Sequence, residues 1–326
     1  MDKIAWIIGE TYIYWQSIML MIASVTAILM FAGLYIGKSG NVAGTAAAVP
    51  MAMLSGLFLA RLVHWYCQSA AYESFTAAIT DWSGGSFALM GVFAGCLLTA
   101  CLLRLVRLVG NLPQMLDCMA IGGGVGIGVG RLAFVFNSAD RGMILPESVE
   151  FPYASAVTNP VSGATENRLA TFMLQSALVA VIVACLLLFM LVQKIRKKKI
   201  PDGDSFLIFL LAYGASQALC DSTRYDKMFF RSNGFVGMVQ IMGLLGMLIP
   251  IVLFSVRMVK SRKLKAWQFV IWTAILGLLG LAGYMEYFVQ RNGHRAALAY
   301  SVMGAALVGV VLLGLLIRAL IRKKEK

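Results

Sequence analysis

The stretch LATFMLQSALVAVIVACLLLFMLV, residues 169–192, followed at once by QKIRKKK, residues 193–199, decides the fold class of this chain. The first part holds no charged residue and is longer than the roughly 20 apolar residues that a helix needs to cross a bilayer. The basic cluster behind it is typical of the cytoplasmic end of such a helix. The stretch therefore predicts a membrane span whose C-terminal end lies in the cytoplasm.

The composition of the whole chain agrees with a bilayer environment. The 326 residues are 60% hydrophobic and 13% charged, and the mean hydropathy is +0.81, which excludes a water-soluble domain of this length. The formal net charge of +13 would suggest nucleic-acid binding in a soluble protein. Here the basic residues form short clusters between apolar stretches, so we attribute the positive charge to the cytoplasmic ends of membrane helices. No nucleic-acid partner is expected.

Apolar stretches of similar length recur along the chain and predict an all-α, polytopic membrane bundle of about nine transmembrane helices. The predicted spans are Gln16–Ile36, Val42–Trp65, Phe87–Val109, Pro113–Phe136, Leu169–Val192, Ser205–Ser222, Phe235–Met258, Trp267–Val289 and Ala297–Ile317. The sixth of these spans is the shortest.

The positions of the basic clusters predict the orientation of the bundle. Clusters follow the third, fifth, seventh and ninth spans, and Lys38 follows the first. Since positive residues are concentrated on the cytoplasmic side, we expect an N-terminus outside the cell membrane, a cytoplasmic C-terminus, and the longest loop, Asn137 to Arg168, on the outer side.

Three arginines, Arg61, Arg131 and Arg224, are predicted at the outer ends of the second, fourth and sixth spans. Arginine stays charged and binds phosphate through paired hydrogen bonds, so three of them on one membrane face favour a site for an anionic phospholipid headgroup. Each arginine alone could instead extend to the interface as a simple anchor.

Two further polar positions lie near these arginines. In the sixth span, Gln217, Asp221 and Arg224 are spaced i, i+4 and i+7, which places them on one helical face, where Asp221 could hold Arg224. The alternative is an ion pair that only neutralises two costly charges and joins helices. His64 follows Arg61 by three residues and could act as a base, or it could belong to an interfacial aromatic belt.

The glycine-rich run IGGGVGIGVG, residues 121–130, precedes Arg131. Its spacing does not fit a dinucleotide-binding G-x-G-x-x-G, and it predicts close packing with a neighbouring helix. The six cysteines form no C-x-x-C pair and have no neighbouring pair of histidines, so no metal site and no disulfide framework are expected.

Four segments, in order, are similar to conserved stretches of the prolipoprotein diacylglyceryl transferase family. Gly130-Arg131 followed by Asn137 resembles its G-R-x-G-N-F-x-N-G-E signature, and residues 82–87, with Gly84 and Gly85, resemble its W-D-G-G stretch. The segment from Arg61 to Tyr66 is similar to A-R-x-x-Y-V, and residues 213–226 are similar to R-F-x-x-E-x-x-R-x-P-D. The matching order extends over roughly residues 10 to 260.

This resemblance implies an enzyme that moves the diacylglyceryl group of phosphatidylglycerol onto the thiol of a lipobox cysteine in a precursor protein, without a metal or organic cofactor. The site would face the outer leaflet. From the residues and the resemblance together, we expect catalytic roles for Arg131, Asp221 and Arg224, and substrate contacts for Arg61, His64, Gly84, Gly85, Gly130, Asn137 and Gln217.

Several family positions are changed in this chain. The signature glutamate is Ala139, the first arginine of the sixth-span segment is Gln217, and the histidine after W-D-G-G is absent. Asp140 or His64 could substitute in part. The alternative function is therefore a non-catalytic relative that binds or moves anionic phospholipid.

The final two spans extend beyond the resemblance. We expect residues 1–260 to form a family-like body of seven helices and residues 261–326 to add two helices with a basic cytoplasmic tail. Glu286, at the outer end of the eighth span, is a carboxylate without a counterpart in the resemblance.

Overall fold

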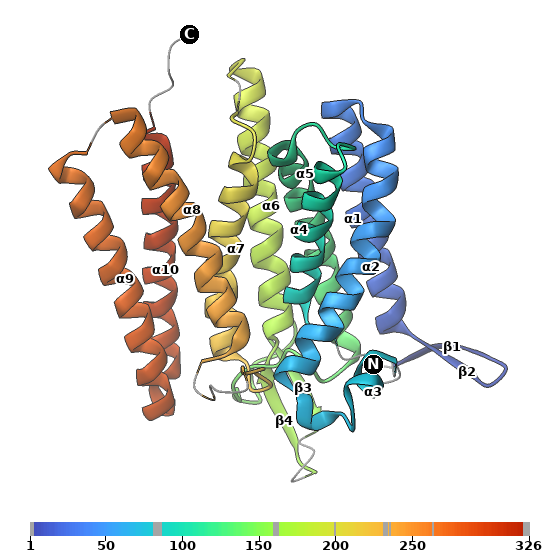
Figure 1. Ribbon diagram of the computed structural model, residues 1–326. Coiled ribbons are helices and arrows are strands. Elements are labelled where there is room, and N and C mark those ends of the chain that lie inside the picture. Colours follow the sequence, from blue (N-terminus) through green and yellow to red (C-terminus); the bar gives the residue numbers. More distant parts are fainter. Residues whose placement is uncertain are drawn as a thin grey trace.

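The computed structural model describes residues 3–80, 87–158, 163–198, 200–230, 234, 236–262 and 264–321. Among these residues, eight helices are long and apolar enough to cross a membrane, and α4 is a shorter apolar helix beside them, so the chain is a polytopic helical membrane bundle (Figure 1). The helices are α1 (Trp15–Ser39), α2 (Val42–Cys67), α3 (Phe75–Thr80), α4 (Leu89–Leu105), α5 (Leu112–Leu132), α6 (Thr171–Ile195), α7 (Asp204–Thr223), α8 (Met238–Arg262), α9 (Ala266–Arg291) and α10 (Ala296–Ala319).

Each of the nine predicted spans corresponds to one of these helices, which confirms the predicted fold class. The third span is shorter than predicted, because α4 ends at Leu105 and the chain then folds back. Arg107 adopts a φ of 60°, and the Val109 N–H donates to the carbonyl of Leu103 at 3.2 Å. This turn removes four residues from the predicted helix.

Two antiparallel β-hairpins were not predicted from the sequence. The first joins β1 (Ile4–Ile8) to β2 (Thr11–Tyr14), and the second joins β3 (Ala154–Thr158) to β4 (Thr165–Leu169). Both lie with α3 at one end of the bundle (Figure 1), which we call the hairpin end. The other end, where α4, α6, α8 and α10 finish, carries the basic clusters and is called the basic end.

The centre of the bundle is α7. It packs against α5, α6, α8 and α10, whereas α1 pairs with α5, α2 with α4 and α9 with α10. Most α7 side chains are buried, and α7 is the least apolar of the eight long helices. Its polar residues are therefore tolerated because they face other helices and not lipid.

The glycine run packs α5 tightly against α1, as predicted. A methyl group at Gly122 would lie 2.8 Å from the carbonyl oxygen of Ala27, and one at Gly126 would lie 2.7 Å from the Cβ of Ala27. Any larger side chain at these two positions would push the helices apart.

The basic end of α7 is held by polar contacts. The Asp117 carboxylate, on α5, accepts hydrogen bonds from the backbone N–H groups of Gly203 and Phe206, both at 2.8 Å. Asp204, the first residue of α7, pairs with Arg257 of α8 at 2.8 Å and with Arg318 of α10 at 2.9 Å. These contacts satisfy the exposed N–H groups of the helix start and tie α7 to three neighbours.

Candidate functional site

The carboxylate of Asp140 lies between two arginines at the hairpin end. Arg131 is in the last turn of α5, and Arg224 directly follows α7. One Asp140 oxygen forms an ion pair with Arg131, and the other lies 2.8 Å from Nη2 of Arg224. Asp140 is 2% exposed and Arg131 is 8% exposed. Two of the three arginines singled out in the sequence therefore meet at one buried carboxylate.

The turn that carries Asp140 is stabilised by side chains close to it in sequence. Asp140 has a φ of 56°, a left-handed conformation that aspartate tolerates better than most residues. The Asn137 side chain accepts a hydrogen bond from the Ala139 N–H at 2.9 Å. Buried Arg141 donates to the carbonyls of Phe134, Asn137 and Ala139 at 2.9–3.1 Å. These bonds hold the turn so that Asp140 reaches the two arginines.

Three carboxylates surround the guanidinium of Arg224. Besides Asp140, its Nε lies 2.9 Å from Oδ1 of Asp226, and its Nη1 lies 3.6 Å from Oδ1 of Asp221. Burial by itself would lower the pKa of Arg224, but the charges of Asp140 and Asp226 raise this pKa above its usual value. The Asp140 N–H also donates to Asp226 at 3.0 Å. Arg224 is thus charged and fixed in position.

A row of buried polar groups runs along α7 toward these arginines. Tyr213, Gln217 and Asp221 are spaced i, i+4 and i+8 on one helical face, and we call them the polar stripe. Tyr213 is close enough to Arg131 to interact with it electrostatically. Within the described part of the chain, the Gln217 amide has no hydrogen-bond partner, and the Tyr213 hydroxyl and the Asp221 carboxylate have only loose contacts, with Arg131 and with Arg224 at 3.6 Å. Unpaired polar groups are costly in a membrane interior, so the polar stripe indicates a place for water or a polar ligand.

Arg61 lies in a second cluster, built by α2, α3 and the residues before α4. Its Nε donates a hydrogen bond to the carbonyl of Ala78, and its guanidinium lies 4.9 Å from the ring centre of Tyr72 and 5.6 Å from that of Phe87. The Tyr72 hydroxyl lies 2.8 Å from Nδ1 of His64. Arg61 and His64 therefore share Tyr72 as a neighbour, in agreement with their spacing on one helical face.

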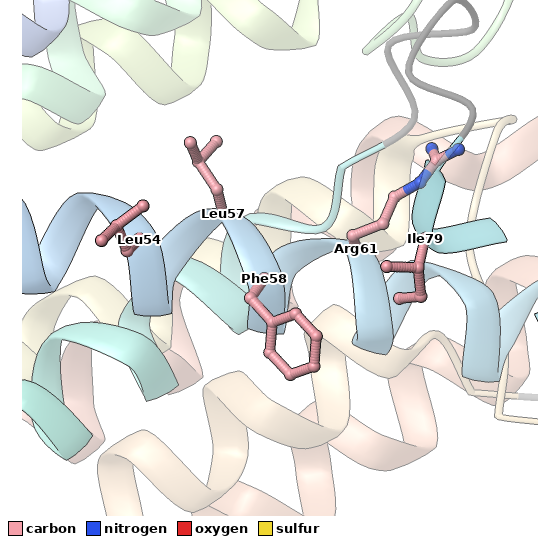
Figure 2. A pocket seen from close by; sticks show the side chains of 5 residues that line it. All are labelled: Leu54, Leu57, Phe58, Arg61 and Ile79. Carbon is pink, nitrogen blue, oxygen red and sulfur yellow. The ribbon is translucent and has the colours of Figure 1, made fainter. Parts of the chain in front are cut away.

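An apolar pocket of about 190 Å³ adjoins this second cluster. It is lined by Leu54, Leu57, Phe58, Arg61 and Ile79. Figure 2 shows the first three in a row along α2, with Arg61 at the end of the row beside Ile79 of α3. An apolar pocket with one cation at its end has the chemistry needed for a lipid chain next to an anionic headgroup.

The remaining residues singled out in the sequence have other surroundings. Gly130 packs toward α1, with the Cβ of Ala23 3.5 Å from where a methyl would lie. Gly84 and Gly85 lie outside the described residues. Asn137 contacts its own turn, and Gln217 belongs to the polar stripe.

Sequence reasoning missed two residues that the structure brings to the arginines, Tyr213 and Asp226. Tyr213 lies four residues before Gln217, which lies four residues before Asp221. This helical spacing could have predicted that Tyr213 shares a face with the other two. Asp226 lies beyond the helix, where spacing does not predict direction, and its only signal was its place at the end of the family-like segment 213–226. Asp140 was weighed only as a substitute for a missing family carboxylate.

Comparisons with known proteins identify the family of the chain. Residues 3–256 match the family model described as prolipoprotein diacylglyceryl transferase. Two curated relatives, both phosphatidylglycerol–prolipoprotein diacylglyceryl transferases of Dehalococcoides mccartyi, from strains BAV1 and CBDB1, are 25% identical over 264 residues. Each alignment covers 80% of this chain and 96% of the relative. The chain belongs to the prolipoprotein diacylglyceryl transferase family.

Proposed function

We propose that this protein transfers the diacylglyceryl group of phosphatidylglycerol to the thiol of a lipobox cysteine in a precursor protein. Family membership supports the class of reaction. The observation that carries the proposal for this chain is the meeting of Arg131 and Arg224, from different helices, at the buried carboxylate of Asp140. Two guanidinium groups at one point can hold one phosphate through paired, charge-assisted hydrogen bonds.

In this reaction the thiolate sulfur of the acceptor attacks the diacylglyceryl carbon bonded to the phosphate oxygen. A carbon–sulfur bond forms, the carbon–oxygen bond breaks, and its electron pair leaves with glycerol phosphate. Arg131 and Arg224 stabilise the charge that develops on this leaving group. The lipid phosphate takes at least one of the two arginine contacts that Asp140 makes in the structure.

The thiol proton needs an acceptor, because the thiolate is the nucleophile. Asp221 is our candidate: its carboxylate is buried, lies at the end of the polar stripe and has no hydrogen-bond partner among the described residues. Gln217, one turn earlier on α7, can donate a hydrogen bond to the lipid or to the acceptor peptide.

The second cluster supplies a further contact for the lipid. Arg61 at the end of the apolar pocket holds an anionic headgroup, while Leu54, Leu57 and Phe58 contact an acyl chain (Figure 2). His64 contributes by orienting Tyr72 beside Arg61.

The orientation follows from the charge distribution. The basic clusters lie at the end opposite the hairpins, so the positive-inside rule places the hairpin end, with the site, at the outer leaflet of the cell membrane and the C-terminus in the cytoplasm. Residues 1–260 form the transferase body, and residues 261–326 are an addition with a basic tail.

The test uses purified protein in detergent with labelled phosphatidylglycerol and a lipobox peptide. We expect a thioether product with the wild type and none with Arg131→Ala, whereas Arg291→Ala, which removes an exposed arginine of α9, keeps wild-type turnover. Thermal unfolding of all three shows whether Arg131→Ala is folded, and Arg131→Gln is the second variant if it is not. Absence of product from folded wild-type protein contradicts transfer.

A second function is favoured by one observation: an internal carboxylate, Asp140, already occupies both arginines. A protein that holds or moves anionic phospholipid without chemistry needs reversible exchange between Asp140 and the phosphate, and no reacting thiol. Binding of phosphatidylglycerol that depends on Arg131, without any thioether product, would identify this function.

A further inference from the structure

A buried carboxylate outside the family match contacts the segment that carries Arg224. Glu286 lies on α9, beyond the matched residues 3–256, and is 6% exposed. It accepts a hydrogen bond from the hydroxyl of Ser222, and its Oε1 lies 3.2 Å from Nζ of Lys227 and 3.3 Å from Nε2 of Gln290. Two of these partners, Ser222 and Lys227, stand on either side of Arg224 in the chain.

Both added helices hold Ser222. The Tyr300 hydroxyl of α10 donates a hydrogen bond to the Ser222 carbonyl at 3.2 Å, while Glu286 of α9 accepts from its side chain. Ser222 directly follows Asp221, and the Arg224 N–H donates to the Asp221 carbonyl at 3.2 Å. A shift of Ser222 would therefore move the end of α7 from which Arg224 extends.

Lys227 connects Glu286 to the same group of charges. Its ammonium group pairs with Glu286 and is also close enough to Asp221 to interact electrostatically. Without Glu286, the ammonium would be free to move toward Asp221 and compete with Arg224 for that carboxylate. Glu286 thus holds a second cation in a fixed position beside the arginine site.

Adhesion of the added helices does not by itself require this carboxylate. The pair α9 and α10 already packs on the bundle through an apolar core that includes Ile275, Met303 and Leu307. At the basic end, Arg318 of α10 also pairs with Asp204 of α7 at 2.9 Å. A buried glutamate is costly in a membrane span, and two of its partners here, Ser222 and Lys227, lie within three residues of Arg224.

We propose that Glu286 is a positioning residue, which holds Ser222 and Lys227 and thereby sets Arg224 for the phosphate of the lipid. This inference rests on the proposed lipid site. By this inference, the two added helices help to position Arg224 in addition to packing on the bundle. The residue acts through Arg224 and does not touch the lipid.

The test is a double-variant cycle on phosphatidylglycerol binding to the purified protein in detergent, with mixed micelles of phosphatidylglycerol and phosphatidylcholine as the probe. The proteins are the wild type, Glu286→Gln, Arg224→Ala and the double variant, and thermal unfolding confirms that each is folded. We expect Glu286→Gln to weaken binding about tenfold in the wild-type background and to have no further effect when Arg224 is absent, since coupled residues are not additive. Glu286→Ala, which also loses the Ser222 contact, should weaken binding more.

The matched control is Arg318→Gln, which breaks an ion pair between the added helices and α7 at the opposite end. It should lower the unfolding temperature and leave lipid binding unchanged in both backgrounds. Equal, additive losses from Glu286→Gln and Arg318→Gln would show that Glu286 only stabilises the bundle and would overturn the proposal.

Transfer assays on the same proteins separate this inference from the proposed function. Coupled binding without a thioether product contradicts transfer and leaves the positioning role in place. A product with additive binding losses contradicts the positioning role alone. Wild-type protein whose lipid binding does not depend on Arg224 would overturn both.

Discussion

The two ends of α7 use buried charge in opposite ways. At the basic end, both oxygens of Asp204 are paired with arginines, and Asp117 accepts two backbone hydrogen bonds. At the hairpin end, two arginines share one aspartate, Asp221 lies 3.6 Å from Arg224, and the Gln217 amide has no hydrogen-bond partner among the described residues. Fully paired charges hold helices together, whereas loosely paired polar groups retain the capacity to bind a ligand. The same helix is therefore a structural anchor at one end and a candidate site at the other.

The largest effect should come from removing Arg224. We expect Arg224→Ala to lower turnover of phosphatidylglycerol by about 10²–10³-fold, because one of two donors to the leaving phosphate is lost. The matched variant Arg257→Ala, at the basic end, should retain turnover within about threefold, since it removes only a structural partner of Asp204. Equal losses of turnover in the two variants would show that the two ends of α7 do not differ in function.

The next effect concerns stability at the basic end. Asp204→Asn leaves Arg257 and Arg318 without their carboxylate, and we expect a loss of about 2 kcal/mol in the free energy of unfolding, measured in mixed micelles. Turnover by the folded fraction should not change. Asp202→Asn, at an exposed neighbouring position, is the control and should have little effect on stability. A specific loss of turnover in Asp204→Asn would show that the basic end also serves the chemistry.

A change of opposite sign is expected at the polar stripe. Gln217→Met removes a buried amide that has no hydrogen-bond partner among the described residues, so the free energy of unfolding should stay the same or rise by about 1 kcal/mol. Turnover should fall about tenfold if the amide binds the substrate. Gln268→Met, which removes a buried glutamine that accepts from the Lys265 N–H, should lower stability and keep turnover. Destabilisation by Gln217→Met would indicate a structural partner for this side chain.

The smallest effect is expected at the turn that carries Asp140. Asn137→Ala removes the bond to the Ala139 N–H, and we expect about 1 kcal/mol lower stability and about threefold lower turnover. Asn41→Ala removes a comparable bond, from the Gly44 N–H at the start of α2, and a second bond to the Leu108 carbonyl, both at the basic end. It should lower stability at least as much and leave turnover unchanged, and a matching fall in turnover would argue against a special role for the turn.

The number and approximate limits of the spans could be read from the chain, because apolar length and basic flanks are local properties. The pairing of Asp221 with Arg224 was also within reach, since both positions belong to one helix end. The hairpin of β1 and β2 was missed because its strands have only five and four residues. The hairpin of β3 and β4 was missed because its two short strands lie among the prolines and polar residues of the loop from Asn137 to Arg168. The path of that loop depends on contacts such as Arg141 with three carbonyls, which no spacing rule predicts.

The arginines show where sequence reasoning stops. Topology predicted Arg61, Arg131 and Arg224 at one depth in the membrane. The structure brings Arg131 and Arg224 to Asp140 and places Arg61 in the separate surroundings of Tyr72 and Phe87. Depth follows from counting residues along each helix, but neighbours depend on which faces of α2, α5 and α7 pack together.

The sequence by itself therefore determined a helical membrane protein with basic flanks, its family resemblance, and the arginines that we propose as phosphate ligands. The length of an apolar stretch and the charge of its flanks are local properties of the sequence, and they can be recognised without knowing which helices pack together. Only the tertiary structure decided that Asp140 is the shared partner of two arginines and that Glu286, from an added helix, reaches the segment around Arg224. These contacts join residues far apart in the chain, and they exist only because helix packing and a left-handed turn bring the side chains together.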